Sequence, residues 1–231
     1  MRLVIVNRLG DYSGGSKHTR KVSEKLLNYF DVTFVPYADF YLNHSEESLK
    51  NLESKGFKVH PSAYERITIK QSLFPRPISF YEEYVKRYRN LDADFIYDPD
   101  FVSPEAILLS NLTGIPVAVT LNHTIYTLYE SVFYTYYSLQ GFLTRSFDYF
   151  LGRTVWLYTI SNQKVKNIRR AKNLRFVGAV SKGILDSIKV NFNKKLIHPG
   201  NGVDFFAEPK DKDDYVVFWT TLIPSKGIFP S

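Results

Sequence analysis

The chain has 231 residues, of which 44% are hydrophobic and 23% charged, and it contains no cysteine. This composition is that of an ordinary globular protein, and the length allows one domain and part of a second. The absence of cysteine excludes a disulfide scaffold, cysteine-based zinc sites and a cysteine nucleophile. The first ten residues lack the long apolar stretch of a signal peptide and are typical of a strand.

Apolar runs and helical patterns alternate along the chain, which predicts βαβ units and a parallel sheet. Residues 3–6 form a continuous apolar run typical of a buried parallel strand. Val22, Leu26, Tyr29 and Phe30 repeat at the spacing of a one-sided helix. Further strands are predicted at residues 32–35, 57–59, 95–97, 117–120, 176–180, 196–198 and 216–219, and helices at 46–55, 81–91, 105–112 and most of 125–170.

Two further features of the pattern concern element ends. Pro104 suits the first turn of the helix at residues 105–112, and Gly114 suits its end. Residues 157–160 fit either a strand or a helix. Together these elements predict the α/β fold class, with helices on both faces of a parallel sheet.

The net charge of +7 is concentrated in one segment. Residues 161–195 hold ten Lys and Arg and a single acid, Asp186, so they carry +9 and leave −2 for the rest of the chain. Aromatic residues crowd the segment just before it, between Tyr126 and Phe150. This combination suits an anionic membrane surface or a nucleic acid. No nucleic-acid-binding motif is visible, which leaves membrane contact or a core helix followed by a solvated basic face.

A glycine-containing connection follows the first strand. Gly14 and Gly15 allow the backbone to approach a ligand closely, and a helix beginning near Ser16 offers free N–H groups to an anion. Lys17 and Arg20 lie in the first turns, where a cation opposes the helix dipole at a cost of about 0.3–1 kcal/mol. A phosphate nearby would explain them. The pattern is not G-x-G-x-x-G, and a structural glycine turn with solvated bases is the alternative.

Asp98 and Asp100 follow the predicted strand at residues 95–97. Carboxylates in this spacing could hold a divalent metal together with a nucleotide diphosphate. The alternative is turn chemistry before Pro99 and a helix cap near Ser103.

His123 lies just past the strand predicted at residues 117–120. In an open α/β sheet the carboxyl ends of parallel strands face the ligand crevice. A histidine there could hydrogen-bond a substrate or transfer a proton near neutral pH. A purely structural histidine is the alternative.

The order of these segments resembles that of the group 1 glycosyltransferases, which have the GT-B fold and retain the configuration of the transferred sugar. The resemblance spans nearly the whole chain, and its most specific parts are residues 201–204 and the pair Lys226-Gly227. The matching segments are 14–15 (GG), 94–97 (DFIY), 114–123 (GIPVAVTLNH), 177–182 (VGAVSK), 196–204 (LIHPGNGVD) and 216–227 (VVFWTTLIPSKG).

The resemblance implies two Rossmann-like domains facing a cleft. Residues 1–206 would be the acceptor-binding domain, and residues 207–231 the linker and first strand of a C-terminal donor domain. Such enzymes transfer a sugar from a nucleotide sugar to a sugar or lipid-linked acceptor, without a bound metal or other cofactor. The family also implies a cytoplasmic protein that can lie peripherally on the inner face of the cell membrane, so we expect an anionic membrane surface as a partner and no nucleic acid.

The resemblance also assigns roles to residues. Gly14, Gly15 and Lys226 would hold the donor diphosphate, and His123 would face the reacting sugar. Ser16, Lys17 and Arg20 are further anion contacts expected from the glycine-containing connection itself. Ser181 matches the serine of a Val-Ser motif.

Two departures from the family leave other functions open. Thr220-Thr221 stands where the family has Gly-Arg, so the charge-assisted contact of that arginine to the diphosphate is missing. The chain also ends four residues past Gly227, which would leave the donor domain truncated and the activity of this chain alone open. A non-catalytic module that binds the acceptor or a membrane is therefore one alternative. A metal-dependent GT-A transferase using Asp98 and Asp100 is another.

Overall fold

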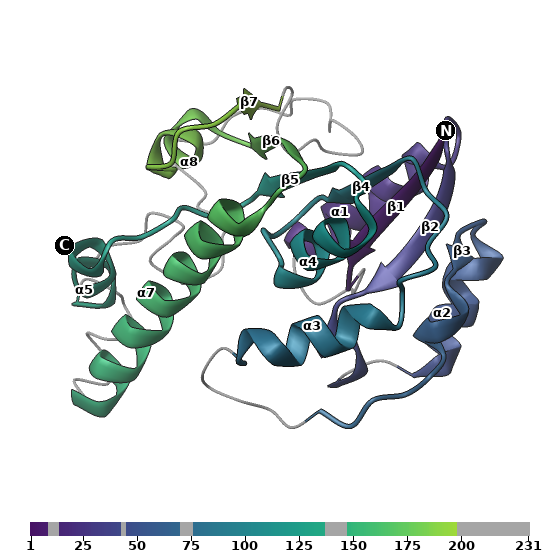
Figure 1. Ribbon diagram of the computed structural model, residues 1–231. Coiled ribbons are helices and arrows are strands. Elements are labelled where there is room, and N and C mark those ends of the chain that lie inside the picture. The colour runs from purple at the N-terminus through teal and green to yellow at the C-terminus, as the bar shows by residue number, and fades with distance from the viewer. Residues whose placement is uncertain (9–13, 43–44, 70–75, 137–146, 198–231) are drawn as a thin grey trace, which may run out of the picture. The chain divides into compact units, whose positions relative to one another are not determined.

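The computed structural model describes residues 1–8, 14–42, 45–69, 76–136 and 147–197 (Figure 1). The chain divides into two compact units. The first consists of Met1–Ile125 and Gln163–Gly200, and the second of Tyr126–Asn162 and Asn201–Ser231. The predicted boundary between residues 206 and 207, the predicted strand at 216–219 and Lys226 all lie outside the described residues.

The first unit is built on a seven-stranded sheet with the strand order β3-β2-β1-β4-β5-β6-β7. Every pair of neighbouring strands is parallel. This is the usual order of a doubly wound sheet with one strand added, and the order reverses between β1 and β4. The predicted Rossmann-like α/β fold is therefore confirmed. The strands are β1 (Arg2–Asn7), β2 (Asp31–Pro36), β3 (Lys58–Val59), β4 (Phe95–Asp98), β5 (Val117–Leu121), β6 (Leu174–Ala179) and β7 (Lys194–Leu196).

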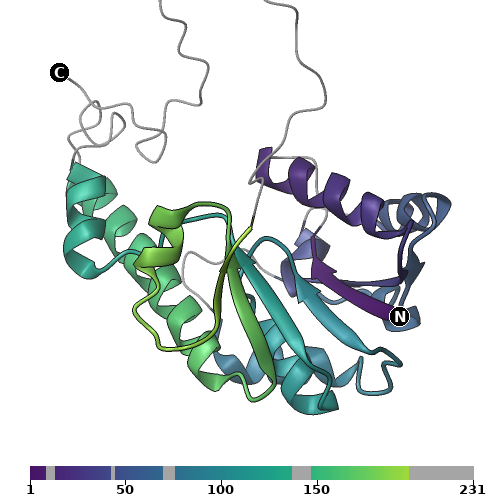
Figure 2. The same ribbon diagram turned by 90° about the horizontal axis from the view of Figure 1, so that it is seen from above.

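Helices cover both faces of this sheet, as right-handed crossovers between parallel strands require. α1 and α4 lie on opposite faces, which is clearest when the sheet is seen from above (Figure 2), and α3 packs alongside α4. The helices of the first unit are α1 (Gly14–Leu26), α2 (Glu46–Ser54), α3 (Ile78–Lys86), α4 (Pro104–Thr113) and α8 (Lys182–Ser187), with short 3-10 turns η1 (Ala38–Leu42) and η2 (Pro61–Ala63).

The described part of the second unit consists of α5 (Leu128–Tyr136) and most of α7 (Phe147–Arg170), whose last turns belong to the first unit. Many large apolar side chains here are exposed. Tyr129 is 78% and Phe147 72% exposed. The others are Leu128, Val132, Phe133, Tyr136, Leu151, Val155, Trp156 and Tyr158.

The core of the first unit lies between the central strands and their helices. Residues 3–6 of β1 and all of β5 are buried. Continuous apolar strands of this kind occur where both faces of a parallel sheet are covered, which is why these strands could be predicted. Phe34 from β2 and Tyr88, just past α3, are among the largest fully buried side chains.

Several predicted boundaries were wrong in informative ways. α1 ends at Leu26, and Tyr29 is 77% exposed instead of continuing the apolar stripe. α3 ends at Lys86, yet Tyr88 is buried in the core because the following turn directs it inward. The ambiguous residues 157–160 are helical within α7. α8, which was not predicted, carries no fully buried residue, and its Ile184 and Leu185 pack partly buried against the core.

The predicted limits of α4 agree with the local chemistry. Ser103 caps the helix by accepting a hydrogen bond from the Ala106 amide at 3.1 Å, and Pro104 follows at the first position. Gly114 ends the helix with φ of 76° and donates its N–H to the Ser110 carbonyl.

Replacing Gly114 by Ala should destabilise the protein by about 1 kcal/mol, because a Cβ is disfavoured in the left-handed region. A Cβ at this position would meet no atom within 4 Å, so the cost is conformational. Urea denaturation measures the difference. Gly183→Ala is the control, since Gly183 also has open space but no positive φ, and it should cost nothing. Equal losses in the two variants would contradict the explanation.

Candidate functional site

The carboxyl ends of the parallel strands lie on one edge of the sheet, and polar residues follow several of them there. Asn7 ends β1, Asp98 ends β4, and Asn122 and His123 come directly after β5. The reversal of strand order between β1 and β4 lies at this edge, which is where open α/β sheets bind their ligands. This edge is therefore the candidate site.

Asp98 is completely buried and organises the turn after β4. Its Oδ1 accepts hydrogen bonds from the Tyr37 hydroxyl at 2.6 Å and the Phe101 amide at 2.9 Å, and its Oδ2 accepts one from the Ser103 amide at 2.8 Å. Burial raises the pKa of the Asp98 carboxyl to about 6, against the opposing effect of these hydrogen bonds. Because protein donors already use both oxygens, Asp98 serves the turn, as the alternative interpretation held.

The turn after β4 does not form the metal site that a GT-A transferase using Asp98 and Asp100 would require. Among the described residues, no group of three or more His, Asp or Glu side chains is arranged to hold a metal ion. Asp100 does not complete a site with Asp98, because its Oδ1 accepts a hydrogen bond at 2.7 Å from the Asn122 amide instead.

The Asp100–Asn122 hydrogen bond connects the loops after β4 and β5. The Asn122 Oδ1 is buried and, within the described part of the chain, accepts no hydrogen bond. His123 follows with an exposed side chain. The structure therefore places a carboxylate, an amide oxygen and an imidazole on two neighbouring connections at the carboxyl edge.

Glu105, in the first turn of α4, is a buried acidic residue that the sequence did not predict as part of a site. Its Oε1 accepts a hydrogen bond at 2.9 Å from the Ala38 amide, just past β2. Burial, with a smaller contribution from the charge of Asp39, raises the pKa of this carboxyl to about 8. Glu105 is therefore largely protonated at neutral pH and joins the β2 and β4 connections without adding a full charge.

Lys164 on α7 is the second buried charge that the sequence did not reveal. The residue is 3% exposed, and its Nζ lies 4.1 Å from the centroid of the Phe101 ring. Within the described residues the ammonium has no hydrogen bond or ion pair to a side chain. Burial lowers the pKa of Lys164 to about 8, although the charges of Asp100 and Asp98 act in the opposite direction.

The signal for both residues was faint. Glu105 occupies a first-turn position of a helix, where acidic residues are common because the helix dipole stabilises negative charge there. Lys164 is one of ten cations in the basic segment, so nothing in the sequence distinguishes it from the others. Only the fold shows that they are buried beside the turn at residues 98–103. Buried titratable groups with displaced pKa values cluster at functional sites more often than elsewhere.

The predicted anion-binding residues lie at the start of α1. Gly14 and Gly15 are the first two residues of the helix, with Ser16 and Lys17 next, so the helix begins two residues earlier than expected. Arg20 is engaged within the helix, because its Nε lies 3.7 Å from the Glu24 Oε1. β1 and β5 are separated by β4 alone, which places the start of α1 and His123 on the same edge of one sheet.

Ser181, the remaining residue of the matched segments, caps α8. Its Oγ accepts a hydrogen bond from the Ile184 amide at 3.3 Å. This accounts for the side chain structurally, and Ser181 joins no other member of the site. Among the described helices, none is both long and apolar enough to cross a membrane.

Comparisons with known proteins are sparse. No protein-family model matches the chain, and no curated protein does. Among solved structures, one similar chain is a UDP-glucosyltransferase from Polygonum tinctorium capable of glucosylating indoxyl, in complex with 3,4-dichloroaniline. It shares 12% sequence identity with a TM-score of 0.48, and the match covers 90% of this chain and 55% of that one. The chain thus spans about half of that structure's length.

The pKa of Glu105 predicts a pH dependence of stability. Because the pKa is about 8 in the folded protein and ordinarily 4.5, the folded state binds more protons between these values, and stability should fall as the pH rises through that range. Glu105→Gln keeps an oxygen for the Ala38 amide but cannot ionise. Urea denaturation at a series of pH values should show that this variant loses the slope between about pH 6 and 8, whereas the raised pKa of Asp98 maintains a slope at lower pH.

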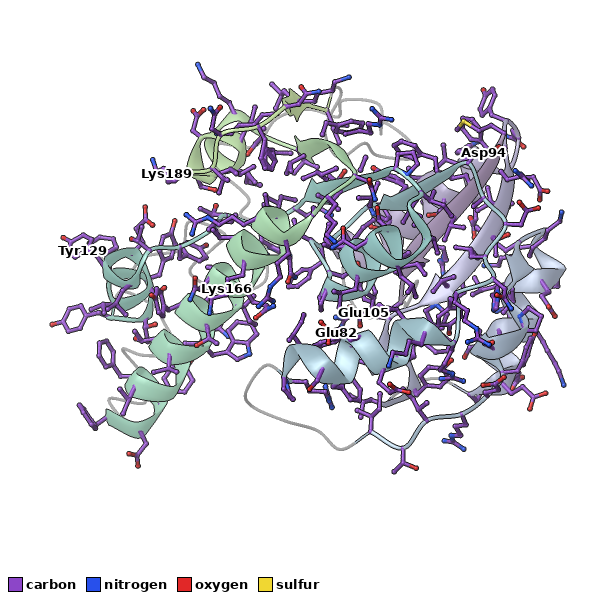
Figure 3. The ribbon with its side chains drawn as sticks, in the orientation of Figure 1. Glu82, Asp94, Glu105, Tyr129, Lys166 and Lys189 are labelled. Atoms are coloured by element: carbon purple, nitrogen blue, oxygen red, sulfur yellow. The ribbon has the colours of Figure 1, made fainter. Side chains whose placement is uncertain are left out.

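Glu82→Gln is the matched control. Glu82 is an exposed carboxyl on α3, and Figure 3 labels both glutamates. This control should keep the wild-type slope. The same slope in the Glu105 variant would mean that another group causes the pH dependence.

Lys164→Met should stabilise the protein at pH 7 by about 1–2 kcal/mol, because replacing a buried charge by an apolar side chain of similar size removes a desolvation penalty. Chemical denaturation tests this. Lys166→Met, at an exposed position on the same helix (Figure 3), is the control and should change stability little. A destabilised Lys164 variant would indicate that attraction to Asp100 outweighs desolvation.

Proposed function

We propose that this chain supplies the acceptor-binding domain of a retaining glycosyltransferase of the GT-B fold, which transfers a sugar from a nucleotide sugar to an acceptor. The observation that carries the proposal is the polar cluster at the carboxyl edge of a doubly wound parallel sheet, beside the reversal of strand order. The succession of matched segments along the sequence gives this edge its chemical interpretation. Residues 1–206 would form the domain, with the donor side beginning at residue 207.

The cluster suits the recognition of a polyhydroxylated substrate. Asp100 offers a carboxylate acceptor for sugar hydroxyls, Asn122 holds this carboxylate by its hydrogen bond, and the buried Lys164 adds positive charge to the site. His123, which directly follows Asn122, would face the reacting sugar. Its imidazole can donate a hydrogen bond to a hydroxyl or accept a proton from one near neutral pH.

The start of α1 would bind the donor diphosphate. The first backbone N–H groups of a helix attract anions, and Gly14 and Gly15, having no side chain, would allow a ligand to approach them closely. Ser16 and Lys17 would add contacts, and Lys226 would approach from the donor side. Arg20 would contribute charge while remaining paired with Glu24. No metal or other cofactor is needed in this scheme.

A non-catalytic binding module is the second candidate, and Thr221 favours it. A neutral threonine cannot supply the bidentate contact of an arginine to a diphosphate. Such a module would keep acceptor binding at the Asp100–Asn122 site but would not turn over a nucleotide sugar.

We also propose that the protein contacts an anionic membrane, which would present a lipid-linked acceptor. The exposed apolar side chains of α5 and the first turns of α7 support this, because monomeric proteins rarely leave so many large apolar groups in water. Tyr129, labelled in Figure 3, is among the most exposed.

Replacing His123 by Ala should reduce the release of nucleoside diphosphate from a panel of nucleotide sugars by about 100-fold, the size typical of a lost proton-transfer group. The chain is incubated with each nucleotide sugar, with and without a membrane extract as the source of acceptor. Asn90→Ala, at an exposed position away from the carboxyl edge, should retain activity.

The outcomes separate the candidate functions. Activity that survives in the His123 variant would reject the role of this residue. Absence of turnover by the unmodified chain, together with acceptor binding that depends on Asp100, would favour the binding module instead.

A further inference from the structure

A groove of about 310 Å³ lies in the first unit where α7 ends and β6 begins, at the opposite edge of the sheet from the candidate site. Apolar side chains form much of it, including Phe176 and Phe192, and Arg169 and Arg175 lie along it. We call it the arginine groove. Its remaining lining residues are Ile168, Ala171, Leu174, Val190, Asn191 and Asn193.

The arginine groove is strongly cationic. No acidic residue lines it, and neither Arg169 nor Arg175 forms an ion pair or a side-chain hydrogen bond with any described residue. A third cation, Lys195, does not line the groove but contacts one of its residues, with its Nζ 5.0 Å from the centroid of the Phe176 ring. By contrast, Arg2, Arg8 and Arg87 are all in ion pairs elsewhere in the unit.

Ordinary structural explanations account for part of this charge. Arg169 lies in the last turn of α7, where the helix dipole stabilises a positive charge. Lys194 and Lys195 lie on β7, the outer strand of the sheet, where lysines discourage edge-to-edge pairing. Neither explanation covers Arg175, which is exposed near the start of β6, beside a hydrophobic wall.

Arginine beside aromatic walls suits a ligand with an anionic and an apolar part. The guanidinium can bind a phosphate through two parallel hydrogen bonds, and it carries its charge at every physiological pH. Phe176 and Phe192 can cover glycerol or acyl carbons next to that phosphate. We propose that the arginine groove binds the phosphate of an anionic phospholipid headgroup.

This inference rests on the membrane contact proposed above and adds a specific site to it. The exposed apolar side chains of α5 and α7 would supply non-specific affinity, whereas Arg169 and Arg175 would select the anionic headgroup. Binding at the groove is independent of the chemistry at the carboxyl edge, so the two can fail separately.

Vesicle flotation of the full chain tests the proposal, with phosphatidylcholine alone or mixed with phosphatidylglycerol. The double variant Arg169→Gln/Arg175→Gln should bind the mixed vesicles roughly tenfold more weakly than the unmodified chain. The matched control is Arg66→Gln/Arg89→Gln, which removes the same charge from exposed arginines that do not line the groove. It should reduce binding by less than about threefold. Unchanged urea midpoints verify that the variants are folded.

Each other outcome overturns the proposal. Equal losses in the two double variants would show that net charge alone drives binding. No binding of the unmodified chain to anionic vesicles would reject both the groove and the membrane contact, while nucleotide-sugar turnover would still decide the enzymatic function. Groove-dependent binding of glycerol 3-phosphate or of an oligonucleotide, without vesicle binding, would identify a soluble ligand instead.

Discussion

The fully buried carboxylate of Asp98 holds the candidate site together. A parallel sheet covered on both faces leaves polar backbone groups unpaired where its strands end, and buried groups of this kind must find partners. Asp98 accepts hydrogen bonds from the Phe101 and Ser103 amides and from Tyr37 beyond β2. One side chain therefore fixes the loop from β4 to α4 and joins it to the neighbouring strand, which positions Asp100 for its bond to Asn122.

The same burial gives the edge its electrostatic character. Desolvation raises the pKa of Asp98 to about 6 and that of Glu105 to about 8, and it lowers the pKa of Lys164 to about 8. All three shifts move these groups toward their neutral forms, and groups with displaced pKa values occur more often at functional sites than elsewhere.

The sequence predicted the sheet better than the site. Strands β1 and β5 could be predicted because a strand that is buried on both faces has a continuous apolar sequence. The residues after those strands could be proposed as ligands because strand ends share one edge, and His123 does lie there. Glu105 and Lys164 could not be found this way, since the burial of a charged side chain depends on packing between segments about 60 residues apart. Asp98 could be mistaken for a metal ligand because an aspartate that follows a strand has the same sequence pattern whether it binds a metal or accepts hydrogen bonds from the backbone amides of its own turn.

The distribution of ion pairs extends the argument from burial to charge. Within the described residues, every ion pair lies between residues 2 and 94 of the sequence. None of the ten cations in residues 161–195 forms an ion pair with a described acidic residue. A protein that merely needed a charged surface could have interspersed acids here, as it does in its first half, and so avoided repulsion among like charges. Concentrating unpaired cations instead lowers the stability of the free protein and raises its attraction for anions. The chain therefore combines a strand edge built on buried titratable groups with a cationic region that is mostly exposed, and the buried Lys164 belongs to both.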